Sequence, residues 1–158
     1  MANSETKNEQ GNMGNEEVIQ VERSFNTSSS VIWKALTDAD EMRKWYFDLT
    51  AFKPEKGFQF SFTGQGREGA NYVHLCEVTE VIPERKLSYS WTYEGLKGYS
   101  EVSFELIPGN GSTMVRITHK GISSFSENGP DFAIQSFAGG WDHILNISLK
   151  DHIEKTKP

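Results

Sequence analysis

The chain has 158 residues, 36% of them hydrophobic and 12% aromatic, a size and composition typical of one globular domain with a single core. The formal net charge is −6 and no run of lysines and arginines interrupts it, so we expect no nucleic-acid partner and no anionic-membrane partner. The single cysteine, Cys76, excludes a disulfide within the chain.

The beginning of the chain is polar. Residues 1–15 are rich in Gly, Asn and Glu and have almost nothing to bury, so we expect a disordered tail there and a single folded domain over residues 16–158. This segment lacks the apolar stretch of a secretory signal, and no apolar run approaches the roughly 20 residues of a membrane span. With the lone cysteine, these features lead us to expect a cytoplasmic protein.

Alternating hydrophobic residues predict a series of strands. Residues 18–25 place Ile19, Val21 and Phe25 on one face, the pattern of a half-buried strand. Further strands are expected over residues 49–53, 58–62, 72–82, 87–93, 102–106 and 113–119. The turns between most of them are short and contain Gly or Pro, which favours an antiparallel sheet.

Helical patterns appear in two places. After the first strand, residues 31–36 predict a short helix, and Asp38 can cap a second helix that ends near residues 45–47. After a loop over residues 122–130, residues 131–155 predict a long helix with one apolar stripe. That stripe must lie on a large apolar surface, and the sheet is the only candidate, so we expect an α+β domain.

Several short motifs follow one another in a set order along the ordered chain. They are residues 31–33, 35–38, Trp45, 80–85, Leu87, Trp91, Ser100, 102–104, 118–119, Gly121, 140–141 and Leu145. Taken together they resemble the START-like superfamily of polyketide cyclases and lipid-transfer domains, closest to the branch named for the activator of the heat-shock-protein ATPase. The resemblance implies a helix-grip fold, in which a curved antiparallel sheet wraps a long C-terminal helix around an apolar cavity. It brings no invariant catalytic motif.

The side chains expected to face that cavity form our candidate ligand site. They are Arg23, Trp45, Phe60, Phe62, Tyr89, Trp91, Phe104, His119, Phe137 and Trp141. The rings would supply buried apolar area, while Arg23 and His119 share the inward parity of their strands and would orient a polar end of the ligand. Both have structural alternatives: an ion pair for Arg23, and a hydrogen-bonded role near a strand end for His119.

Other motifs give weaker indications. Residues 64–69 spell G-x-G-x-x-G, but a strand follows instead of a helix, so we interpret them as a hairpin turn that could form a lip over the cavity. His74 and Cys76 lack further ligands at suitable spacing, so no metal and no cofactor are predicted. Gly139 and Gly140 interrupt the long helix, and we expect either close backbone approach to a neighbour or hinging of the helix.

Three functions remain open from the sequence. The first is binding of a small apolar or amphipathic molecule without chemistry. The second is regulation of a heat-shock-protein ATPase, which would make that protein a partner. The third is a cyclase- or hydrolase-like reaction, for which Arg23, His119, Tyr72, His74 and Tyr89 are the available groups. A connected cavity of some hundreds of Å3 would favour the first or third, and a filled core the second.

Overall fold

A six-stranded antiparallel sheet forms the body of the protein. The computed structural model describes residues 18–66 and 69–156, so the predicted tail over residues 1–15 lies outside the described residues. The strands are β2 (Val18–Phe25), β3 (Gln59–Gln65), β4 (Asn71–Ile82), β5 (Lys86–Tyr93), β6 (Ser100–Pro108) and β7 (Thr113–Lys120). Their order in the sheet is β2-β7-β6-β5-β4-β3, so consecutive strands form a meander and β2 closes it beside β7.

The alternation in the sequence decides which face of the sheet is buried. In the central strands, Phe104 lies opposite Ile117 and Val102 opposite His119, and all four side chains are at most 2% exposed. A shift of register between Val78 and Glu80 interrupts the β4–β5 pairing, and such an irregularity increases the local twist of a sheet. The inner face is therefore concave and apolar.

The strand expected over residues 49–53 is absent, which corrects the prediction. Leu49 and Phe52 are nevertheless buried, at 1% and 7% exposure, so the hydrophobic signal came from an irregular segment that packs into the core. Arg43 Nη1 donates to the carbonyl oxygen of Leu49 at 3.0 Å. The strand β3 pairs only with β4, so its open edge forms no ladder with this segment.

Two short helices follow β2, as the sequence predicts. Helix α1 (Ser29–Thr37) begins after Ser28, whose hydroxyl accepts from the Val31 amide. Helix α2 (Ala39–Trp45) begins after Asp38, whose carboxylate accepts from the amides of residues 40 and 41. Both caps satisfy amides that would otherwise lack partners at a helix start.

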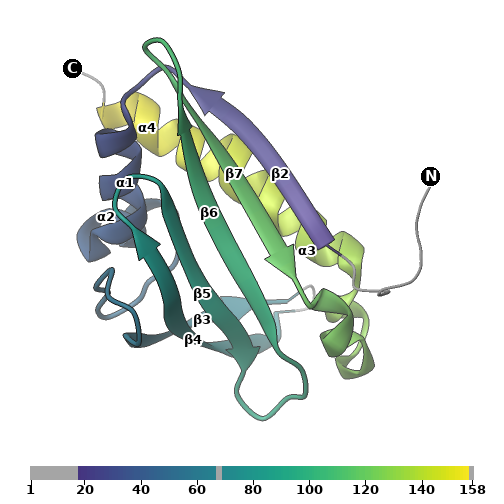
Figure 1. Cartoon of the computed structure of the whole chain (residues 1–158). Coiled ribbons are helices and arrows are strands. Elements are labelled where there is room, and N and C mark those ends of the chain that lie inside the picture. The colour runs from purple at the N-terminus through teal and green to yellow at the C-terminus, as the bar shows by residue number, and fades with distance from the viewer. Residues whose placement is uncertain (1–17, 67–68, 157–158) are drawn as a thin grey trace.

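The C-terminal helix crosses the concave face of the sheet (Figure 1). The loop expected before it contains two 3₁₀ helices, η1 (Ile122–Asn128) and η2 (Pro130–Phe132), so the long helix begins three residues later than predicted. It comprises α3 (Ile134–His143), a π-helical segment η3 (Ile144–Leu149) and α4 (Lys150–Thr156). None of the helices in the described part of the chain is long and apolar enough to cross a membrane.

The predicted stripe of the long helix is confirmed. Phe137, Trp141, Leu145 and Leu149 are at most 9% exposed, whereas Ile147 on the opposite side is 50% exposed. The Trp141 ring lies 5.5 Å from that of Trp91 and 5.9 Å from that of Phe104, measured between centroids. This contact fixes the register of the helix on the sheet and positions the site described next.

Candidate functional site

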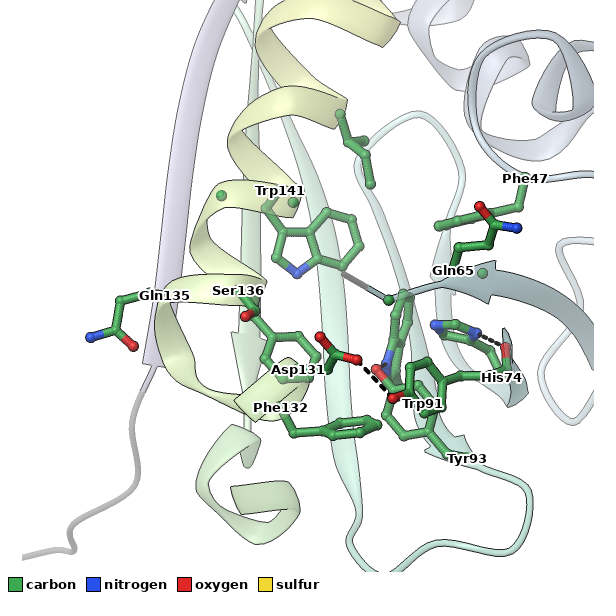
Figure 2. Close-up of a pocket in the computed structure, with 17 residues that line it drawn as sticks. Phe47, Gln65, His74, Trp91, Tyr93, Asp131, Phe132, Gln135, Ser136 and Trp141 are labelled. Atoms are coloured by element: carbon green, nitrogen blue, oxygen red, sulfur yellow. Dashed lines mark hydrogen bonds between the residues drawn. The ribbon is translucent and has the colours of Figure 1, made fainter. Parts of the chain in front are cut away.

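A cavity of about 510 Å3 lies between one end of the sheet and the C-terminal helix (Figure 2). Strands β3, β4 and β5 form one wall, and η2, α3 and the first residue of η3 form the other. Its lining consists of Phe47, Gly64, Gln65, Gly66, Tyr72, His74, Trp91, Tyr93, Asp131, Phe132, Gln135, Ser136, Phe137, Gly139, Gly140, Trp141 and Ile144. Most of the larger side chains are aromatic, so a ligand here would contact mainly ring surfaces.

Three of the ten predicted site residues line this cavity: Trp91, Phe137 and Trp141. Four others, Phe60, Phe62, Tyr89 and Phe104, are buried in the core. Phe62 supports the wall indirectly, because its ring stacks on the lining side chains of Phe47 at 4.1 Å and His74 at 4.5 Å. For the core residues that do not line the cavity, the role of ligand contact stays a prediction.

Trp45 and Arg23 lie away from the cavity. The Trp45 indole donates to the carbonyl of Ala35 at 2.8 Å, and its ring borders a second hollow between α2 and the end of the long helix. Arg23 is half-buried, and its guanidinium donates to the side-chain oxygen of Asn146 at 3.0 Å. The partner of Arg23 on the long helix is thus an amide, where an ion pair was the structural alternative expected from the sequence.

His119 is fully buried and belongs to a chain of hydrogen bonds behind the cavity wall. Trp141 Nε1 donates to His119 Nδ1 at 2.9 Å, so the other ring nitrogen carries the proton and donates to the Ser100 hydroxyl at 2.8 Å. That hydroxyl in turn donates to the carbonyl of Trp91 at 2.9 Å. Burial lowers the pKa of His119 to about 3, so the ring is neutral and orients Trp141.

His74 is the histidine that reaches the cavity. It is 7% exposed, and its Nδ1 lies 3.0 Å from the carbonyl oxygen of Tyr72, which makes this nitrogen the donor. Burial lowers the pKa of His74 to about 4. The side chain is therefore neutral near pH 7.

Several lining residues are not among the predicted site residues. The sequence did contain a signal for Tyr93, because it shares the inward parity of Tyr89 and Trp91 on the same strand. No sequence pattern indicated Phe132, since it lies in a 3₁₀ turn without a hydrophobic period. Phe47 follows the end of a helix, where neither periodicity applies.

Gly139 and Gly140 correct another expectation. A Cβ atom added at either position would meet nothing within 4 Å, so close approach of a neighbouring backbone does not explain them. Both border the cavity instead, and the missing side chains leave its volume free. Ala138, between Phe137 and the glycines, does not line it.

Gly66, the residue after β3, brings the end of this strand against η2. A Cβ atom on Gly66 would clash with the Asp131 carboxylate, so this backbone packs directly on a side chain of η2. A lip formed by residues 64–69 stays a prediction, because residues 67 and 68 lie outside the described residues. The Tyr72 hydroxyl donates to the same carboxylate at 2.7 Å, joining β4 to η2. This hydrogen bond raises the pKa of Tyr72. This polar contact thus belongs to a lining whose larger side chains are mostly aromatic.

Reactive groups near the cavity are held in unreactive states. Cys76 is buried, and burial raises the pKa of its thiol, so it stays protonated. No group of three side chains suited to a metal ion is found among residues 18–66 and 69–156.

Comparison with known proteins gives one family and many similar folds. The model of the family described as "Activator of Hsp90 ATPase homolog 1-like protein" matches residues 26–154. Protein MLL2253 from Mesorhizobium loti is 26% identical, with a TM-score of 0.73 over 90% of this chain and 100% of that one. CalU16 from Micromonospora echinospora is 21% identical, with a TM-score of 0.68 over 86% of this chain and 75% of that one. No curated protein matches the chain.

Proposed function

Because the chain belongs to the family of Activator of Hsp90 ATPase homolog 1-like proteins, whose START-like fold supports ligand binding, we propose that it binds a small apolar or amphipathic molecule. The ligand occupies the cavity between the sheet and the C-terminal helix and leaves it chemically unchanged. The cavity itself is the observation that carries this proposal. Its volume of about 510 Å3 falls in the range of small-molecule sites, roughly 300–1,000 Å3.

The chemistry of the lining supports binding without turnover. Rings from both walls offer apolar surface, which contributes roughly 25 cal/mol per Å2 buried before the cost of association is subtracted. General acid–base catalysis needs a group that exchanges protons near the working pH. His119 has both ring nitrogens hydrogen-bonded within the protein, and the pKa of His74 is lowered to about 4. Neither histidine therefore meets this requirement near pH 7.

A leucine at position 140 is expected to abolish binding without unfolding the protein. The added Cβ meets no atom within 4 Å, so the side chain can extend into the cavity. Leucine also favours a helix over glycine by somewhat less than about 1 kcal/mol. An environment-sensitive apolar dye should gain fluorescence with the native protein and not with Gly140→Leu, while the melting temperature of the variant is equal or higher.

The matched control is His143→Leu, which adds the same side chain at an exposed position that does not line the cavity. It should leave the dye signal unchanged. A dye signal that survives in Gly140→Leu would place the dye elsewhere and contradict the proposal. A native mass spectrum of freshly purified protein is an independent measurement. It should show any co-purified molecule bound to the native protein and none bound to Gly140→Leu.

The family description favours a second candidate, stimulation of an Hsp90 ATPase. A hollow of about 560 Å3 between α2 and the end of the long helix offers a surface for such a partner. Trp45 and Ile147 border it beside Lys44 and Lys155. In this case the native protein should raise the ATPase rate, and Lys44→Glu should reduce the effect while Gly140→Leu does not. An unchanged rate with the native protein would exclude this candidate.

A further inference from the structure

One polar group in the cavity wall has a hydrogen atom without a described acceptor. Trp91 Nε1 donates to the Tyr93 hydroxyl at 2.8 Å, so the oxygen of Tyr93 already serves as an acceptor. Both side chains line the cavity and are 4% and 7% exposed. Among the residues that the structure describes, none accepts a hydrogen bond from Tyr93 itself. A buried hydroxyl donor normally has a partner, and here the adjoining space is the cavity.

The surroundings of this hydroxyl are uncharged. The Tyr93 ring lies 4.7 Å from that of His74, between centroids, and burial keeps His74 neutral by lowering its pKa to about 4. Burial also raises the pKa of Tyr93, so its hydroxyl keeps its proton. The pair therefore offers a neutral donor with a neutral ring beside it.

The lining residues that the structure describes offer no positive charge to an anion. Within the described parts of the chain, no lysine or arginine lines the cavity, and the one charged side chain that does is the carboxylate of Asp131. A carboxylate ligand would lose its hydration beside the carboxylate of Asp131, and moving a charge from water into such surroundings is costly. The lining therefore disfavours fatty acids and other organic acids.

We propose that the cavity selects an uncharged, largely apolar molecule with a hydrogen-bond acceptor, such as a carbonyl oxygen, that accepts the hydrogen bond of Tyr93; this rests on the ligand-binding function proposed above. The rings of the wall bind apolar molecules of many kinds. Tyr93 then determines specificity, because a ligand without an acceptor leaves the hydroxyl unpaired, and a site built to hydrogen-bond its ligand discriminates against analogues that lack the group.

Three naphthalene derivatives of similar size test the inference. They are 2-acetylnaphthalene, which carries a carbonyl, 2-ethylnaphthalene, which does not, and 2-naphthoate, which is charged. Dissociation constants are measured by equilibrium dialysis against the native protein and Tyr93→Phe. The ratio of the ketone constant to the hydrocarbon constant should rise at least about threefold in the variant, the effect of losing one neutral hydrogen bond. The naphthoate should bind at least tenfold more weakly than the ketone to the native protein.

Tyr46→Phe is the matched control. It removes the same atom from a tyrosine that does not line the cavity and whose hydroxyl pairs with that of Tyr89 at 2.7 Å. The ratio should stay within twofold of the native value. A second measurement needs no variant: the infrared carbonyl band of bound, isotope-labelled ketone should shift to lower frequency than in hexane.

The outcomes separate this inference from the function on which it rests. If ketone and hydrocarbon both bind but the ratio rises less than threefold in Tyr93→Phe, or the carbonyl band stays at its hexane position, the selectivity is overturned and the cavity remains a binding site. If the naphthoate binds more tightly than the other two probes, the proposal that the ligand is uncharged is overturned. The ligand-binding function is not affected by that outcome. If none of the three probes binds the native protein, both proposals fail.

Discussion

Replacing Trp141 by alanine should lower the free energy of unfolding by about 3–5 kcal/mol, the usual cost of deleting a large aromatic side chain from a core. The ring is 2% exposed and packs on Trp91 and Phe104. Its loss also removes the donor to His119 Nδ1, which leaves a buried acceptor unpaired and adds to the cost. Urea unfolding followed by circular dichroism measures the change.

Ile147→Ala is the control for this experiment. Ile147 lies on the same helix but is 50% exposed, so its substitution should change the stability by no more than about 0.5 kcal/mol. Equal costs for the two variants would contradict the observed register of the long helix. A cost at Trp141 below about 1 kcal/mol would show that the sheet–helix contact is much looser than described.

Acid should destabilise the protein well before its carboxylates are protonated. His74 and His119 have pKa values lowered by burial from 6.5 to about 4 and about 3, so the unfolded chain binds protons on these rings when the native protein does not. Stability is then fully present above about pH 6.5, and it falls as the pH drops towards the native pKa values. At pH 5 the two rings together should cost about 4 kcal/mol relative to pH 8.

The variant His119→Gln separates this effect from other titrations. It should be less stable at pH 8, because the bonds to Trp141 and Ser100 are disturbed. Between pH 7 and pH 5, however, it should lose only about half as much stability as the native protein, since one buried ring no longer titrates. The exposed His143→Gln should follow the native curve, and an unchanged slope in His119→Gln would refute the assignment.

Much of the fold could be predicted because burial follows simple periods. Period two is consistent with Phe104 and Ile117 both being buried, and helical spacing with a buried Trp141 and an exposed Ile147. The segment around Leu49 shows the limit of this reasoning. It is hydrophobic enough for a strand, but it forms no ladder with the open edge of β3, and hydrophobicity alone does not show whether a segment pairs.

The candidate site was less predictable, because alternation says which side chains point inward but not which of them meet each other. Phe60, Tyr89 and Phe104 fill the space between one another, with ring centroids 5.0 Å and 5.8 Å apart. Trp91 and Tyr93, further along the same strand as Tyr89, border the cavity instead. The difference depends on sheet curvature and on where the helix lies, and neither can be derived from local sequence.

The position of β2 beside β7 has a consequence for the protein while it is being made. Residues 18–25 pair with residues 113–120, so β2 leaves the ribosome long before its partner exists. At roughly 5–20 residues per second, the wait is on the order of 5–20 s. During that time the inward side chains of β2 and α1 have neither sheet nor C-terminal helix to cover them. Chaperones that hold nascent chains should therefore bind this segment first and release it only after β7 has been synthesised.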